Sequence, residues 1–217
     1  MTQRPNIAGD PFAGRAPPSH ERTSGVPWDA SYRDGPAPWD VGPQPAIVRV
    51  ASRGGFTGDV LDAGCGSGEN ALHLASLGLP VVGFDVADTA LAIARRNAEE
   101  RGLAAEFVSA DAFDLATLGR TFATVLDCGL YHTFDEDERP RYVASLTNVA
   151  QHGGTLYVLC FADGPNAGPH PIREEDLRAS FTPRAGWNVT SIERERVLTR
   201  YHDEHGAPAW LATIVRA

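Results

Sequence analysis

The 217-residue chain contains no lysine, so all 19 of its basic residues are arginine. This absence excludes a phosphate-binding loop that ends in Gly-Lys, and it excludes a lysine Schiff base with pyridoxal phosphate. Cysteine is also scarce, because Cys65, Cys128 and Cys160 lie far apart and show no CxxC spacing. Such a pattern favours neither a disulfide framework nor a zinc site, and we expect no bound metal.

Long apolar runs and clusters of positive charge are missing as well. No apolar stretch approaches the ~18–20 residues of a membrane-spanning helix. The first twenty residues lack the apolar core of a secretory signal. The net charge is −9 without any basic stripe, which disfavours binding to nucleic acid. The sequence therefore predicts a cytoplasmic protein whose partners are neither membranes nor nucleic acids.

From about residue 55 onward, short apolar runs alternate with amphipathic runs. The predicted strands are residues 59–64, 81–85, 105–111, 122–129, 154–162, 187–198 and 209–216. The predicted helices are residues 68–77, 88–101, 135–150 and 172–180. Strands that alternate with helices are typical of an α/β fold, in which helices cover both faces of a parallel sheet.

A glycine-rich loop follows the first predicted strand in the stretch VLDAGCGSG, residues 60–68. Ligands of such sheets bind beyond the carboxyl ends of the strands, and Gly64, Gly66 and Gly68 would let the backbone approach one closely. Asp85 ends the second strand, where a carboxylate can accept hydrogen bonds from both hydroxyls of a ribose. Together these features predict a cofactor that contains a nucleoside.

The loop reads G-x-G-x-G, and Glu69 stands where the dinucleotide fingerprint has its third glycine. A carboxylate beside the helix start would repel a pyrophosphate, and it suits a ligand with an amino group and a cationic centre. A nicotinamide-dependent oxidoreductase and a non-catalytic cofactor-binding protein remain alternatives. So does a loop whose glycines serve only to form a tight turn.

The order and spacing of these motifs over residues 55–165 resemble the class I methyltransferases that use S-adenosylmethionine. The resemblance implies a Rossmann-like, mostly parallel sheet of seven strands with an antiparallel last strand. It places Asp85 on the ribose, Val86 against the adenine, and Asp111 with Ala112 at the adenine edge. The cofactor-binding residues that it implies are Trp39, Asp62, Gly64, Cys65, Gly66, Gly68, Asp85, Val86, Asp111, Ala112 and Asp127.

The stretches PWDVGPQP and LDCGLYHTFD, which begin at residues 38 and 126, carry a narrower resemblance. Both are similar to the thiopurine- and halide-methyltransferase-like enzymes and to bacterial methyltransferases of heterocyclic toxins and thiols. This implies that residues 26–50 fold over the cofactor as a lid. Trp28 and Tyr32, four residues apart, would share one helical face and bind the substrate. Residues 1–25 would form a disordered tail, and residues 51–217 the methyltransferase domain.

Methyl transfer from a sulfonium requires mainly that the acceptor be positioned and water excluded. His132 is the candidate general base or orienting group, and Tyr131 is a second candidate; both would also bind the substrate. Either side chain could instead pack beneath the pocket. The H-x-x-H pair His202 and His205 favours a solvated turn over a metal site.

These features lead to one hypothesis about function. The enzyme would transfer a methyl group from S-adenosylmethionine to a sulfur or oxygen of a small apolar molecule. That molecule would be heterocyclic or would carry a thiol, and the reaction would serve detoxification or natural-product tailoring. A monomer and a homodimer are equally compatible with the sequence.

Overall fold

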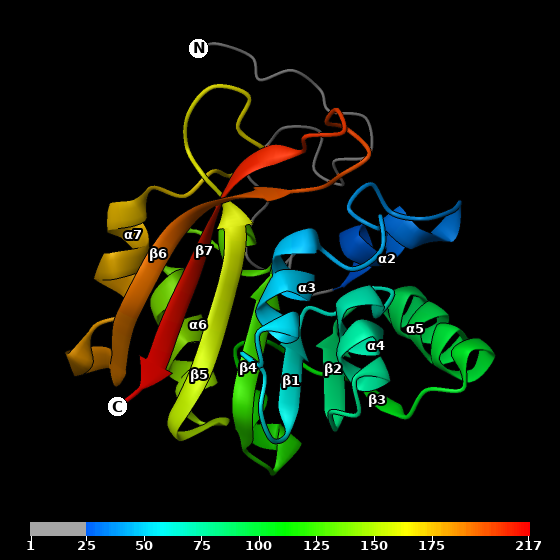
Figure 1. Ribbon diagram of the computed structural model, residues 1–217, viewed down its shortest axis with the longest axis horizontal. Coiled ribbons are helices and arrows are strands. Elements are labelled where there is room, and N and C mark those ends of the chain that lie inside the picture. The colour runs from blue at the N-terminus through cyan, green and yellow to red at the C-terminus, as the bar shows by residue number, and fades with distance from the viewer. Residues whose placement is uncertain (1–24) are drawn as a thin grey trace.

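The computed structural model describes residues 25–217, so the predicted tail of residues 1–25 lies outside the described residues except for Gly25. Seven strands form one sheet in the order β3-β2-β1-β4-β5-β7-β6. Their bounds are β1 Val60–Ala63, β2 Val81–Asp85, β3 Ala105–Ser109, β4 Phe122–Cys128, β5 Ala150–Phe161, β6 Trp187–Val197 and β7 Ala207–Arg216. The strands β1 to β5 pair in parallel, whereas β7 is antiparallel to both of its neighbours (Figure 1). This confirms the predicted mostly parallel sheet with an antiparallel last strand.

Helices cover both faces of the sheet, α3, α4 and α5 on one side and α6 and α7 on the other (Figure 1). The bounds are α2 Val26–Arg33, α3 Pro45–Ser52, α4 Glu69–Ser76, α5 Asp88–Arg101, α6 Glu138–Thr147 and α7 Glu174–Ser180, with 3-10 turns η1 Leu115–Leu118, η2 Tyr131–Thr133 and η3 Pro183–Ala185. Among the described residues, none of the helices is long and apolar enough to cross a membrane.

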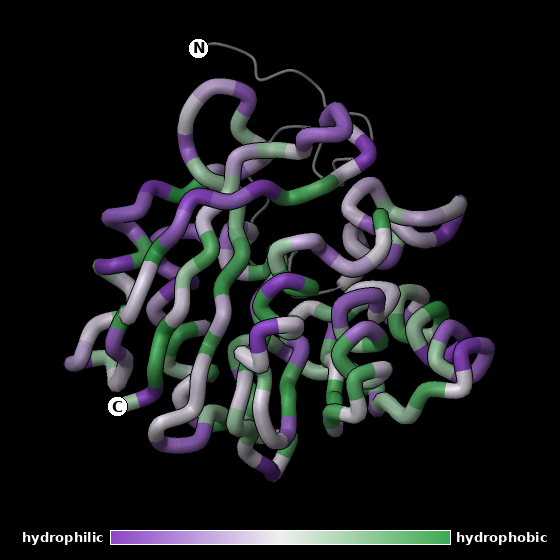
Figure 2. The backbone as a smooth tube through the Cα atoms, viewed as in Figure 1, coloured by the Kyte–Doolittle hydropathy of each residue, from purple (hydrophilic) through white to green (hydrophobic). Residues whose placement is uncertain are grey.

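The central strands are mostly apolar because both faces of the sheet are buried. The neighbours Val60 and Leu61 of β1 have no exposed surface, and they belong to the two separate apolar layers on opposite faces. In Figure 2 the middle of the sheet is mostly green and white, whereas the loops above it carry much of the purple. The apolar runs in the sequence therefore mark strands that pack against helices on both sides.

Several predicted boundaries differ from the structure by two to four residues. The strand β5 begins at Ala150 rather than at residue 154, because Ala150 pairs with Phe122 of β4 across a register shift. The helix predicted from residue 135 begins at Glu138. Asp135 and Glu138 nevertheless hydrogen-bond each other's backbone amides through their carboxylates, at 2.9 and 3.1 Å. This reciprocal pair is a capping arrangement that fixes the entry into α6.

The direction of β6 decides which loops can reach a ligand. Since β7 is antiparallel to both β5 and β6, β6 runs in the same direction as β5. The turn between β6 and β7 therefore lies at the edge where the parallel strands end. Figure 1 shows this turn above the sheet, together with α2 and the long loop that follows β5.

Candidate active site

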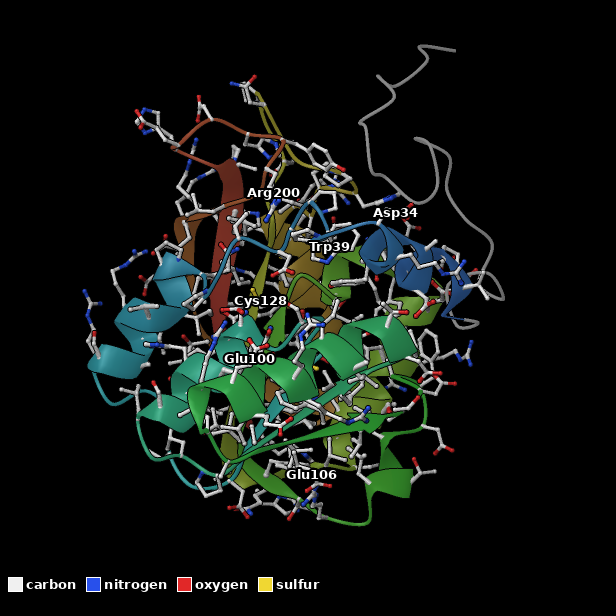
Figure 3. The ribbon with its side chains drawn as sticks, turned by 90° about the vertical axis from the view of Figure 1, so that its right-hand side faces the viewer. Asp34, Trp39, Glu100, Glu106, Cys128 and Arg200 are labelled. Carbon is white, nitrogen blue, oxygen red and sulfur yellow. The ribbon has the colours of Figure 1, made fainter. Side chains whose placement is uncertain are left out.

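A cavity lies at the carboxyl edge of the sheet and has three sides. One side, here the glycine-loop wall, consists of Gly64, Cys65, Gly66, Ser67, Phe84, Asp85, Val86, Asp111, Ala112 and Phe113. The lid, residues 25–44, contributes Trp28, Tyr32, Trp39, Asp40, Gly42 and Gln44. The far wall contains Leu130, His132, Phe134, Phe161, Pro169, His170, Thr199, Tyr201 and His202. In Figure 3 Trp39 and Arg200 lie above Cys128, and Glu106 lies at the opposite end of the sheet.

Gly64, Gly66 and Gly68 all have left-handed backbones, with φ of 68°, 54° and 83°. A Cβ added to Gly66 would lie 2.5 Å from the hydroxyl oxygen of Tyr32, which belongs to the lid. A Cβ added to Gly68 would lie 2.9 Å from the ring of Phe107. The turn therefore requires glycine, and Gly66 also lets the lid approach the loop closely.

Asp85 organises the glycine loop through its two carboxylate oxygens. Oδ2 accepts a hydrogen bond from the amide of Gly66, and Oδ1 accepts one from the amide of Ala87, both at 2.9 Å. Burial raises the pKa of Asp85, and its backbone hydrogen bonds oppose that rise. Each oxygen has a second lone pair, so the carboxylate can accept further hydrogen bonds from a ligand in the cavity.

Two other predicted cofactor residues, Asp62 and Asp127, do not line the cavity. Oδ2 of Asp62 is buried without a hydrogen-bond partner, and burial raises the pKa of this carboxyl to about 7. Asp127 accepts hydrogen bonds from the hydroxyl of Tyr142 at 2.8 Å and from the amides of Leu130 and Tyr131. Burial raises the pKa of Asp127 to about 6. Asp127 therefore holds the start of η2 in place beneath the cavity, and Gly68 likewise lies outside the lining.

Three aromatic side chains of the lid form one cluster over the loop. The indole Nε1 of Trp39 donates a hydrogen bond to the hydroxyl of Tyr32 at 2.8 Å. The ring of Trp39 meets those of Trp28 and Tyr32 edge to face, with centroids 6.0 and 6.1 Å apart. The predicted helical face of Trp28 and Tyr32 is present in α2, and the structure brings both residues to the cavity together with Trp39.

The lid is anchored at both of its ends. Oδ1 of Asp29 accepts a hydrogen bond from the amide of Thr89 at 2.7 Å, and α5 has no side-chain cap of its own at this end. After Gln44 the chain enters α3, whose Ala46 and Ile47 are buried in the same layer as α4. The part of residues 26–50 that lies over the cavity therefore ends at Gln44.

The structure separates the two catalytic candidates. Tyr131 has no exposed surface, and its hydroxyl shares a 2.6 Å hydrogen bond with that of Ser180. It lies outside the cavity lining, and burial raises its pKa to about 12. His132 lines the cavity, and its ring centroid lies 4.7 Å from that of Phe161. Its Nδ1 is buried without a partner, and burial lowers its pKa to about 3, so the imidazole is neutral near pH 7.

Part of the far wall was missed by the reasoning from sequence. His202, assigned to a solvated turn, lines the cavity, and its Nδ1 lies 2.6 Å from the hydroxyl oxygen of Thr199. His205 of the same turn is exposed. Among residues 25–217 no group of three or more acidic, cysteine or histidine side chains could hold a metal ion. The sequence analysis contained a signal for this placement, namely the expected antiparallel last strand. That strand makes β6 parallel to β5 and so puts the turn after β6 at the edge where the ligand binds.

The charge of the cavity lining is negative. Asp40, Glu69, Asp85 and Asp111 line it, whereas no arginine of the described chain does. The carboxylate of Glu69 also pairs, at 2.5 and 3.1 Å, with the guanidinium of Arg101, which does not line the cavity. The other three carboxylates still suit a ligand with a cationic centre, and the aromatic lid suits its less polar parts.

Comparison with known proteins agrees with this geometry. A protein-family model described as a methyltransferase domain matches residues 60–154. The 2-heptyl-1-hydroxyquinolin-4(1H)-one methyltransferase of Mycobacteroides abscessus is 38% identical over 166 residues, which cover 74% of this chain and 72% of that protein. An Arabidopsis thaliana protein named probable thiol methyltransferase 2 is 29% identical over 181 residues, 81% of this chain and 79% of that one.

Solved structures show the same fold. One of them comes from work on the conversion of a disulfide bond into a thioacetal group during echinomycin biosynthesis. It has a TM-score of 0.79 and is 36% identical in sequence, and the match covers 89% of this chain and 92% of that chain. The Burkholderia thailandensis 1,6-didemethyltoxoflavin-N1-methyltransferase has a TM-score of 0.69 at 19% identity, covering 94% and 91%, and supports the fold alone.

The chain therefore belongs to the class I S-adenosylmethionine-dependent methyltransferases. It is an enzyme that transfers a methyl group from S-adenosylmethionine to a small molecule. This excludes the nicotinamide oxidoreductase and the non-catalytic binding protein that the glycine loop alone left open. The lining, which is acidic and contains no arginine of residues 25–217, fits a cofactor that carries a sulfonium and an amino group.

Proposed function

We propose that the enzyme methylates an acidic hydroxyl of a neutral, apolar heterocyclic molecule, in detoxification or natural-product tailoring. The observation that carries this proposal is the far wall, where the neutral imidazole of His132 packs against the ring of Phe161, in a lining to which residues 25–217 contribute no arginine. An anionic acceptor such as a carboxylate or phosphate would find no opposite charge there. A flat, uncharged ring system would pack against the aromatic side chains.

On the glycine-loop wall, we assign the ribose hydroxyls to Asp85 and the adenine to Val86 and Ala112. Trp39 would cover the methionine end, since it lies over the loop in the lid. When bound, S-adenosylmethionine supplies a methyl group already activated on a sulfonium. The protein's own contribution is to align the acceptor with that methyl group and to exclude water, which the lid and the far wall are placed to do.

His132 determines which acceptors suit the site. As an uncharged imidazole it can accept a hydrogen bond from the acceptor's O–H and orient the oxygen. Because its pKa is about 3, it holds a proton only weakly. The acceptor must therefore give up its own proton to water as the new O–CH3 bond forms and the methyl–sulfur bond breaks, which is the property of an N-hydroxy or similarly acidic hydroxyl group. Tyr131, outside the cavity, would act only by holding η2 against α7.

A thiol is the second candidate acceptor. The structure from the study of thioacetal formation is 36% identical and covers most of both chains, which favours sulfur chemistry as strongly as the quinolone relative favours oxygen. A thiol also loses its proton readily and needs no strong base. The same apolar lining accommodates either group.

The test uses methyl-labelled S-adenosylmethionine with a hydroxyquinolone and a dithiol side by side. We expect label on the hydroxyquinolone, and we expect His132→Gln to lower that rate at least about tenfold. The matched control is His205→Gln, which changes an exposed histidine. Label on the dithiol alone would replace oxygen by sulfur as the acceptor and would make His132 dispensable. Transfer to neither compound would contradict the proposed acceptor class.

A further inference from the structure

The lid is hydrogen-bonded directly to the hairpin turn, residues 198–206, that joins β6 to β7. The buried side chain of Gln44 makes two of these bonds with one residue. Its Oε1 accepts from the amide of Leu198 at 2.8 Å, and its Nε2 donates to the carbonyl of Leu198 at 3.0 Å. A single side chain thus satisfies both backbone groups of a residue 154 positions away in the sequence.

Further bonds join the same two segments. The amide of Arg200 donates to the carbonyl of Pro38 at 2.8 Å, and Nε of Arg200 donates to the carbonyl of Asp40 at 3.2 Å. Figure 3 shows Arg200 and Trp39 in the upper half of the molecule. The lid and the hairpin turn therefore touch through both backbone and side-chain contacts, and Gln44 contributes the buried part.

The lid is also bonded to the loop and helix that hold the cofactor. The hydroxyl of Ser67 donates to Oδ1 of Asp40 at 2.7 Å, and the amide of Gln44 donates to Oδ1 of Asn70 at 2.9 Å. Residues 38–44 thus lie between the glycine loop with α4 on one side and the hairpin turn on the other. A shift of this stretch cannot leave the hairpin turn unchanged without breaking the hydrogen bonds of the buried Gln44 side chain, which is costly.

The hairpin turn carries a large part of the far wall, namely Thr199, Tyr201 and His202. We propose that Gln44 is a positioning residue that couples the two halves of the site: closure of the lid on the cofactor sets the hairpin turn and so completes the far wall. The enzyme would then bind S-adenosylmethionine before its acceptor. The acceptor part of this inference rests on the proposed function, whereas the coupling does not.

A purely structural role for Gln44 makes a different prediction. Gln44 is also the residue before α3, so it could serve only to start that helix. In that case its loss would lower stability without changing how the hairpin turn responds to the cofactor. The two roles are separated by a measurement that follows the hairpin turn itself while the cofactor site is filled.

The experiment is hydrogen exchange with S-adenosylhomocysteine at saturation and no acceptor. In the wild-type enzyme we expect exchange to slow at least about fivefold in residues 26–40 and also in residues 198–206. In Gln44→Ala we expect the slowing in 26–40 to remain and that in 198–206 to fall below about twofold. Gln151→Ala is the matched control, since it removes an exposed glutamine side chain. The side-chain nitrogen Nε2 of Gln151 lies 3.5 Å from the carbonyl oxygen of Thr121. This variant should behave as the wild type.

A milder variant covers the case in which Gln44→Ala does not fold. Arg200→Ala removes only the side-chain bond to Asp40, and it should reduce the slowing in 198–206 by about half. Full slowing of exchange in residues 198–206 in both variants, or no slowing there in the wild type, would overturn the coupling.

In steady-state kinetics with the hydroxyquinolone, Gln44→Ala should raise the acceptor KM about tenfold and leave kcat within about twofold. If the exchange result holds but the hydroxyquinolone is not methylated, the proposed function fails and the coupling stands.

Discussion

The glycine-loop wall and the far wall lie a few side chains apart, yet they are built in different ways. The first comes from residues 64–113, where three strands end in succession, and it depends on backbone geometry, as in the bond from the Gly66 amide to Asp85. The second collects side chains from η2, from the end of β5, from the loop after it and from the hairpin turn. The backbone geometry of the glycine-loop wall is specified by residues close together in the sequence. The side chains of the far wall come from distant segments, and they can change without altering the glycine-loop wall. The cofactor is therefore easier to infer from the fold than the acceptor.

The largest effect should follow from adding one methyl group to the glycine-loop wall. In Gly66→Ala the new Cβ would lie 2.5 Å from the Tyr32 hydroxyl, on a backbone with φ of 54°. We expect binding of S-adenosylhomocysteine to weaken about 100-fold, since a clash and a strained backbone together cost about 2–4 kcal/mol. Calorimetry measures this. Gly119→Ala is the control, with φ of 66° and open space around the added Cβ. Equal affinities in the two variants would contradict the close approach of the lid.

The next largest effect concerns the carboxylate that organises the same wall. Asp85→Ala leaves the amides of Gly66 and Ala87 without their partner and removes the proposed ribose contacts. We expect the affinity for S-adenosylhomocysteine to fall about 30-fold, or about 2 kcal/mol. The exposed neighbour Asp88, changed to Ala, should leave the affinity unchanged. Normal calorimetric affinity in Asp85→Ala would remove the ribose assignment.

On the far wall, the prediction concerns pH. Burial lowers the pKa of folded His132 to about 3, below its ordinary value of about 6.5 in the unfolded chain. The folded state therefore binds fewer protons between these values, and His132 makes the protein less stable as the pH falls through about 6.5 toward 3. The raised pKa values of Asp62 and Asp127 act in the opposite direction, since they favour the folded state at low pH.

His132→Gln removes the first of these effects and leaves the other two. Relative to the wild type, the free energy of unfolding of His132→Gln should improve by about 2 kcal/mol when the pH is lowered from 7 to 5. Urea denaturation at the two pH values measures the difference. The same comparison for the exposed His205→Gln should show almost none. A pH-independent difference for His132→Gln would mean that His132 is not held neutral by burial.

The smallest effect should come from the lid, which touches both walls. Trp39→Ala removes the ring that contacts Trp28 and Tyr32, and we expect about tenfold faster release of S-adenosylhomocysteine. Trp39→Phe keeps a ring and loses only the hydrogen bond to the Tyr32 hydroxyl, so its effect should be about two- to threefold. Stopped-flow fluorescence measures the release rate. Wild-type release and turnover in Trp39→Ala would reduce Trp39 to a packing residue.

Much of the glycine-loop wall, and the capping pair before α6, was predictable from sequence because the signals are local. The strand before Gly64, the carboxylate at the end of β2 and the pair of Asp135 with Glu138 each depend on residues close together in the chain. The assignments that changed depend on distant partners. Tyr131 lies outside the cavity lining, where its hydroxyl bonds Ser180 of α7, and His202 lines the cavity, where its ring centroid lies 6.2 Å from that of Phe161.

The sequence by itself determined the alternation of strands and helices, the glycine loop and the class of cofactor. Each of these follows from hydrophobic period, backbone freedom and short-range spacing, which act within a few residues. Only the tertiary structure decided that the lid meets the hairpin turn through Gln44 and that the side chain of His202, rather than that of His205, lines the cavity. Those contacts depend on the strand order, which brings residues 44 and 198 together at one edge of the sheet, and no local pattern of side chains encodes that order.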